Sequence, residues 1–373
     1  MTDRLSPLHD LHVAAGASFT DFAGWQMPVS YGSDLAEHHA VRTAAGIFDI
    51  SHMAEITVAG TDAAAFLDSA LAGRLSAVPL LKAKYTLLLA EDGGIVDDLI
   101  VYHTGETEYL VVANAGNHDP VVAALLQRTG DFDVEVTDIS DELALIAVQG
   151  PNSRGIVEEA LDLDLDGLGY YASVEGSFAG QSLMIARTGY TGEDGFELYV
   201  DVADAASLWT ALLAAGEPHG LIPAGLASRD TLRLEAGMPL YGHELGLDTL
   251  PAAAGLGRVP VMSKEFVGKA GLEQAGTPKR VLVGLSTEGK RAGRAGYGVF
   301  VATPEGVAAE GEAVGVITSG ALSPTLGHPI AMAYVDADAV DLPLAIDVRG
   351  TRIAASVVSL PFYKRFNTSS EAL

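Results

Sequence analysis

The sequence predicts an α+β protein of two or three domains that ends in an all-β domain. Three observations lead to this prediction. The chain has 373 residues, 49% of them hydrophobic and 19% charged, which is typical of a globular protein with a large core. Runs with helical spacing are interspersed with β-branched strand patterns up to about residue 275. Beyond that point the runs are short, β-branched and separated by turns, which favours a barrel or a jelly roll.

Charge and cysteine usage exclude several classes of function. The 49 Asp and Glu residues against 22 Lys and Arg residues give a formal net charge of −27, which repels phosphate backbones, so we expect no nucleic-acid partner. The chain has no cysteine, which excludes disulfides, thiolate metal sites and a cysteine nucleophile. Neither a signal-peptide core nor an apolar run of about 18 residues is present, so we expect a cytoplasmic protein without membrane association.

A metal site is also not expected. His38 and His39 are adjacent, so they point apart on a helix, and neither they nor His52 belong to a His-Glu-x-x-His pattern. Hydrogen-bonded histidines near the surface or the core edge are the more ordinary interpretation.

The elements before residue 275 follow from periodicity and turn chemistry. A turn-rich aromatic segment over 22–28 precedes a helix over 33–42, in which Asp34 and Glu37 are placed for a capping box. The runs 84–89 and 95–102 flank a Glu-Asp-Gly-Gly turn and predict an antiparallel hairpin. Further elements are expected at 54–58 (strand), within 61–80 (helix), at 109–114 (strand), near 118–128 (helix), at 143–149 (strand, then a turn and a helix start at Pro151), at 182–200 (two strands around a glycine-rich loop) and at 225–237 (helix).

The second strand of that hairpin carries two adjacent carboxylates, Asp97 and Asp98, in an otherwise apolar run. Strand side chains alternate, so Asp98 should share one face with Val96 and Tyr102 while Asp97 takes the other. At least one carboxylate therefore enters an apolar setting, where it needs a donor, a cation or a ligand, or has a raised pKa. These residues alone leave turn capping and a functional carboxylate equally open.

Residues 189–195 hold three glycines in seven positions, which lets the backbone approach a flat group or adopt positive φ. The loop lacks the Gly-Lys-Ser/Thr and G-x-G-x-x-G patterns of nucleotide-binding loops. On the strand that follows, alternation by itself favours a solvated outer face for Glu197.

The helix over 225–237 places Arg229 and Arg233 four residues apart on one face. Such a like-charge pair is unfavourable unless anions lie nearby. Asp230 and Glu235 can supply them, and so can the carboxylate of a ligand; the two interpretations are equally open.

Taken together, these stretches resemble the aminomethyltransferases, or T-proteins, of the glycine cleavage system. Each matching piece is weak alone, but their order and spacing make the resemblance specific, and Ser228 in place of the usual alanine is a small departure. The pieces are FAGWQMP (22–28), HHAVR (38–42), FDISHM (48–53), GGIVDDLIVY (93–102), VQGPN (148–152), GYTGE (189–193), RDTLRLEAG (229–237), TSG (318–320) and SPTLG (323–327).

The resemblance implies a three-domain cloverleaf around a central channel that binds tetrahydrofolate. Two α+β lobes are interleaved in sequence, one over 1–55 with 136–245 and one over 56–135 with 246–276, and a C-terminal β-barrel covers 277–373. The implied reaction takes an aminomethyl group from the dihydrolipoyl arm of H-protein and gives 5,10-methylenetetrahydrofolate and ammonia, with no metal. The partners are thus lipoylated H-protein and tetrahydrofolate, a co-substrate.

By motif position, the resemblance implies that Asp98 is the essential carboxylate and that Glu197 accepts the N–H donors of the pterin. It implies the following folate-site residues: Tyr85, Tyr102, Asn114, Tyr190, Glu197 and Arg229.

Two other functions fit the same implied fold. One is a folate-dependent demethylase or methyltransferase that acts on a small amine or sulfonium donor, and the other is a folate-binding protein without turnover. An iron–sulfur-assembly relative carries Lys-Gly-Cys-Tyr where this chain has Arg187-Thr188-Gly189-Tyr190, so that branch fits poorly.

Overall fold

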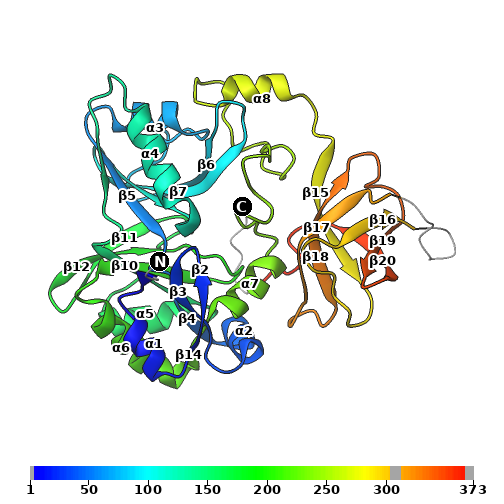
Figure 1. The fold of residues 1–373 in the computed structure, drawn as a ribbon. Coiled ribbons are helices and arrows are strands. Elements are labelled where there is room, and N and C mark those ends of the chain that lie inside the picture. Colours follow the sequence, from blue (N-terminus) through cyan, green and yellow to red (C-terminus); the bar gives the residue numbers. More distant parts are fainter. Residues whose placement is uncertain (1–3, 303–311, 366–373) are drawn as a thin grey trace.

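The structure is a computed structural model that describes residues 4–302 and 312–365. The described chain forms two α+β lobes and a separate barrel, with α7 (Leu226–Glu235) between the first lobe and the barrel (Figure 1). The predicted α+β class and the C-terminal barrel are confirmed. Within the described ranges, every helix falls short of the length and apolarity needed to cross a bilayer.

The first lobe is built on a six-stranded sheet in the order β11-β12-β13-β10-β4-β14. One face packs on α5 (Ser153–Leu161) and α6 (Ala205–Gly216) through an apolar core. The strands are β4 (Ala45–Asp49), β10 (Leu143–Gln149), β11 (Ser173–Phe178), β12 (Gln181–Ala186), β13 (Gly195–Asp201) and β14 (Leu221–Pro223). The N-terminal part adds β1 (Arg4–Leu5), α1 (His9–Ala14), β2 (Ser18–Phe22), β3 (Trp25–Ser30) and α2 (Asp34–Thr43).

The second lobe has a five-stranded sheet in the order β6-β7-β8-β5-β9, covered on one face by two helices. Its other face packs against the free face of the six-stranded sheet, through a cluster that includes Tyr102, Val112, Leu145 and Tyr199. The elements are β5 (Ala54–Ala59), α3 (Ala63–Ala70), β6 (Ala83–Leu89), β7 (Ile95–Gly105), β8 (Glu108–Ala113), a 3₁₀ turn (Ala115–Asn117), α4 (His118–Arg128) and β9 (Glu135–Asp138).

The C-terminal strands close into a barrel in the order β15-β18-β17-β16-β19-β20, rather than into a jelly roll. Helix α8 (Lys269–Ala275) leads into it along the upper edge of the molecule (Figure 1). The interleaved lobe boundaries drawn from the resemblance stay a prediction. The strands are β15 (Arg280–Thr287), β16 (Gly298–Val301), β17 (Gly315–Leu322), β18 (Pro329–Asp336), β19 (Leu344–Val348) and β20 (Thr351–Val358).

The predicted hairpin is confirmed as β6 and β7, which pair antiparallel. The predicted face of Val96 is wrong, because a register shift between Leu88 and Leu89 interrupts the alternation where β7 begins. Val96 packs against the core under α3 and α4, whereas Asp98 lies on the opposite side of the sheet.

The predicted capping box of α2 is also wrong. Ser33 is the N-cap, and its hydroxyl oxygen accepts a hydrogen bond from the backbone N–H of Ala36. Asp34 is the first helical residue. Glu37 turns away from the helix start and accepts the backbone N–H groups of Tyr31 and Gly225, so it ties α2 to the segments before it and before α7.

Candidate active site

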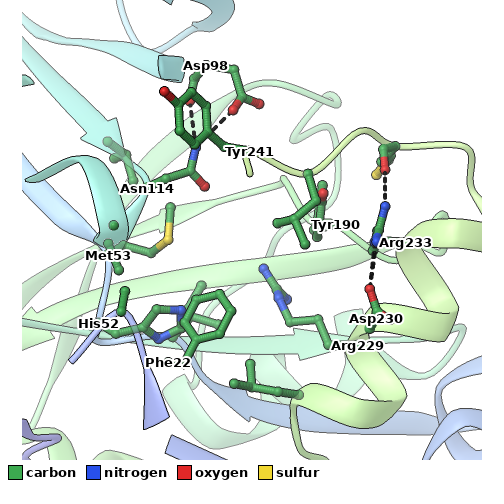
Figure 2. Close-up of a pocket in the computed structure, with 18 of the residues that line it drawn as sticks. Phe22, His52, Met53, Asp98, Asn114, Tyr190, Arg229, Asp230, Arg233 and Tyr241 are labelled. Atoms are coloured by element: carbon green, nitrogen blue, oxygen red, sulfur yellow. Dashed lines mark hydrogen bonds and ion pairs between the residues drawn. The ribbon is translucent and has the colours of Figure 1, made fainter. Parts of the chain in front are cut away.

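A cavity of about 850 Å³ lies between the two lobes and α7. The second lobe supplies Asp98 and Tyr85, the first lobe supplies Glu197, and α7 supplies Arg229; β2 contributes Phe22 (Figure 2). Six of the seven predicted site residues line it: Tyr85, Asp98, Asn114, Tyr190, Glu197 and Arg229. The structure therefore brings together residues that lie up to 144 positions apart in the sequence (from 85 to 229).

Asp98 projects from β7 into this cavity, and neighbouring side chains hold both of its oxygens. The hydroxyl of Tyr85 donates to Oδ2 at 3.1 Å, and Nδ2 of Asn114 donates to Oδ1 at 2.9 Å. Burial raises the pKa of Asp98 from its usual 3.8 to about 6, although these two donors oppose the rise. Asp98 can therefore accept or return a proton near neutral pH.

Asp97 points away from Asp98 and is fully buried. It accepts the backbone N–H of Asn114 at 3.0 Å, and it accepts the side-chain amides of Asn114 at 2.8 Å and Asn117 at 2.6 Å. Burial, followed by the charge of Asp98, raises the pKa of Asp97 to about 7. Asn114 thus bridges the two carboxylates, so turn capping does not explain the pair.

Glu197 is only 7% exposed and lines the cavity, so the solvated outer face favoured by strand alternation is wrong. The alternation itself holds, because Phe196 and Leu198 pack into the core under α5 and α6. The opposite face is dry because the second lobe covers it. The hydroxyl of Thr188 donates to Oε2 of Glu197 at 2.6 Å.

Tyr102 is the predicted site residue that the structure places outside the lining of the cavity. It is fully buried between the two sheets, where its ring packs edge-on against that of Tyr199 with centroids 5.7 Å apart. Its hydroxyl contacts Thr188 at 3.0 Å, so it reaches Glu197 only through Thr188.

The two arginines of α7 have different environments. Arg233 is 1% exposed and pairs with Asp230 at 2.8 Å and Glu244 at 2.9 Å. Arg229 lies near the rings of Phe48 and Tyr190, and its Nη1 has no hydrogen-bond partner among the residues that the structure describes (Figure 2). Arg229 therefore remains available to a ligand, although burial lowers its pKa.

Glu235, the other anion expected beside these arginines, lies in a different network. Its carboxylate accepts Arg42 at 2.9 Å and contacts His38 at 3.2 Å. The hydroxyl of Thr325, which follows β17, donates to the same carboxylate at 2.7 Å. The network joins α2 and α7 to the barrel, and so sets the position of the helix that presents Arg229.

His52 is a cavity residue that the sequence reasoning missed. Burial lowers its pKa to about 4, so the ring is neutral at physiological pH. Its Nδ1 has no partner within the described ranges, and the ring packs edge-on against Phe22. Its place in the FDISHM piece (48–53), three residues after β4 ends, was the signal in the sequence. The hydrogen-bonded interpretation holds for His38, which contacts Thr231.

The glycines of residues 189–195 make room for a protein side chain. A Cβ at Gly189 or Gly195 would overlap the flat amide of Gln149, and Gly192 has a φ of +80°. Gln149 donates to the backbone carbonyl of Thr188 at 3.1 Å. The glycines therefore fix the loop that carries Thr188 and Tyr190.

Comparisons with known proteins agree along the whole chain. The GCVT N-terminal domain family matches residues 8–264, and the glycine cleavage T-protein C-terminal barrel domain family matches residues 280–364. An aminomethyltransferase of Streptomyces avermitilis is 56% identical, with 97% of this chain and 98% of that protein covered. One of Moorella thermoacetica is 46% identical, with 96% and 98% covered.

A solved structure shares the fold as well. The crystal structure of glycine cleavage system aminomethyltransferase T from Bartonella henselae superposes with a TM-score of 0.88 at 37% identity, covering 97% of this chain and 98% of that one. Family models, sequence relatives and a solved structure thus agree on one assignment. The chain belongs to the glycine cleavage T-protein family of aminomethyltransferases.

Proposed function

We propose that this member of the family uses tetrahydrofolate as its co-substrate and takes the aminomethyl group from the dihydrolipoyl arm of H-protein. The observation that carries the proposal is the grouping, in one cavity, of a titratable carboxylate on Asp98, an acceptor on Glu197 and a cation on Arg229, whose Nη1 has no hydrogen-bond partner among the described residues. A reduced pterin with a carboxylate-bearing tail offers N–H donors and anionic oxygens, which match this set.

Glu197 and Arg229 would orient the co-substrate, and Asp98 would act on the reacting nitrogen. The methylene carbon exchanges its bonds to sulfur and to the amine for bonds to two folate nitrogens. Two N–H protons therefore have to reach the departing amine and thiolate, so that ammonia and the free dithiol form. Asp98, with a pKa of about 6, is suited to take such a proton or to stabilise the nitrogen as it gains positive charge.

The aromatic lining of the cavity supports the same proposal. Tyr85, Tyr190 and Phe22 contribute aromatic surface to its wall. A methylene-iminium species would hydrolyse to formaldehyde in water, so aromatic walls that limit the access of water to a bound substrate would protect the one-carbon unit.

The decisive experiment measures methylenetetrahydrofolate and ammonia formed from aminomethylated H-protein and tetrahydrofolate, with and without this protein. We expect folate-dependent turnover that Asp98→Asn abolishes and that Glu175→Gln, on the exposed part of β11, leaves unchanged. If folate binds but only a small amine or sulfonium donor yields product, the demethylase or methyltransferase alternative replaces the proposal. If folate binds and no donor is turned over, the protein is a non-catalytic folate binder.

A further inference from the structure

Three buried hydroxyl groups form a chain that ends on Glu197. Tyr199 donates to the hydroxyl of Tyr102 at 3.3 Å, Tyr102 contacts Oγ1 of Thr188 at 3.0 Å, and Thr188 donates to Oε2 of Glu197 at 2.6 Å. All four residues are buried. They come from β7, β13 and the loop between β12 and β13, so the chain crosses from one sheet to the other.

The chain has a single direction. A hydroxyl has one hydrogen to donate, and an ionised carboxylate can only accept. Because Thr188 gives its hydrogen to Glu197, Tyr102 must donate to Thr188 and Tyr199 to Tyr102. Each donor polarises the next, so the chain strengthens the final bond to the carboxylate.

We propose that Thr188, Tyr102 and Tyr199 are positioning residues that hold Glu197 as an ionised hydrogen-bond acceptor, with its other oxygen, Oε1, available to the N–H groups of the co-substrate. Within the part of the chain that the structure describes, the side-chain hydrogen bond to Glu197 uses Oε2 alone, and the side chain lines the cavity. The inference rests on the proposed function, since it explains how the site selects a heterocycle with adjacent N–H donors. It also assigns a role to Tyr102, which does not itself line the cavity.

Other charged and titratable groups lie around the three hydroxyls, but they do not replace the hydrogen bond from Thr188 to Glu197. Burial raises the pKa of Glu197. Two effects oppose this rise, the hydrogen bond from Thr188 and, more weakly, the charge of Arg229. Tyr170 and Tyr171, before β11, face Glu197 as further phenols. Behind the chain, Glu55 faces Tyr199, and burial raises the pKa of Glu55 well above its usual value. Loss of the Thr188 hydroxyl therefore leaves Arg229 as the one nearby group of opposite charge among the described residues.

The test is tetrahydrofolate binding to the full-length protein as a function of pH. Thr188→Val keeps the shape of the side chain and removes its hydroxyl. We expect the dissociation constant to rise about 10-fold at pH 7.5, and the acid limb of binding to move to higher pH, because Glu197 then becomes neutral more readily. Thr188→Ser, which keeps the hydroxyl, should have the dissociation constant and the acid limb of the wild type. The control Thr210→Val, on the exposed side of α6, should change neither quantity.

Kinetics separate positioning from catalysis. With Thr188→Val we expect a raised KM for tetrahydrofolate and a kcat at saturation within about 3-fold of the wild-type value, since Asp98 is untouched. Tyr102→Phe removes the donor to Thr188 and should move the acid limb in the same direction by a smaller amount. It also serves as the deciding variant if Thr188→Val fails to fold.

Each outcome decides one proposal. Wild-type protein that binds tetrahydrofolate, together with variants whose affinity and acid limb are unchanged, would overturn the role of the hydroxyl chain alone. Wild-type protein that binds no tetrahydrofolate would overturn the proposed function, and the role of the chain with it.

Discussion

Asp98→Asn should inactivate this protein and, at pH 8, also stabilise its fold. The pKa of Asp98 rises from 3.8 to about 6 on folding, so ionising this group costs about 3 kcal/mol more in the folded chain than in the unfolded chain. Water in the cavity screens part of this cost, and we expect a gain of about 1–3 kcal/mol in the free energy of unfolding. Asparagine fits the site, because its oxygen can still accept from Asn114 while its amide donates to the hydroxyl of Tyr85.

The sign of this effect depends on pH in a defined way. Unfolded Asp98 ionises near pH 3.8 and folded Asp98 near pH 6, so the penalty is absent below the first value and complete above the second. The stability advantage of Asp98→Asn should therefore shrink as the pH falls from about 6 to 4. Turnover should fall by about 10²–10⁴-fold, with folate affinity nearly intact.

Urea denaturation of the wild type and of Asp98→Asn at pH 8, 6 and 4.5 measures the stability effect, and product formation measures the activity. Asp10→Asn, on the exposed side of α1, is a matched surface control that should show neither effect. A variant less stable than the wild type at pH 8, or a difference that does not depend on pH, would refute the burial argument. Near-normal turnover would remove Asp98 as the essential group.

Three further predictions concern the surroundings of the site. Arg42→Met leaves the buried carboxylate of Glu235 without its arginine, so the free energy of unfolding should fall by about 3–5 kcal/mol in denaturant titrations. A fall below about 1 kcal/mol would contradict this prediction. Gly189→Ala forces the amide of Gln149 aside and should lower the free energy of unfolding by about 1–3 kcal/mol in the same titrations. Gly155→Ala, in open space on α5, should leave the free energy of unfolding unchanged or raise it. Glu197→Ala should weaken tetrahydrofolate binding by about 10–100-fold in calorimetry, and an unchanged dissociation constant would remove Glu197 from the site.

Several features of this protein could be predicted from local sequence because their causes are local. The β6–β7 hairpin follows from two apolar runs around a diglycine turn, and α7 follows from helical spacing that ends at Gly237, whose φ is +65°. The placement of Asp98 in an apolar strand could also be predicted from the sequence, because a carboxylate among β-branched residues requires a partner whatever the tertiary structure is.

The partners of charged groups could not be predicted in this way. Arg233 pairs with Glu244, eleven residues on, and Glu235 with Arg42, 193 residues earlier. The sequence offered Asp230 as a partner for either arginine of α7, and the structure shows that it pairs with Arg233 at 2.8 Å. Spacing along a helix shows which side chains share a face, but it does not show what the rest of the chain brings to that face.

By itself, the sequence determined the secondary structure around the site, the all-β C-terminal domain and, through the order of its motifs, the family. Only the tertiary structure decided that Glu197 is buried, that Tyr102 lies behind the cavity wall and that Gly189 and Gly195 pack against Gln149. The reason is physical. Strand alternation assigns residues to one of two faces, and whether a face is wet or dry depends on the element that covers it, here a second sheet that packs across the first.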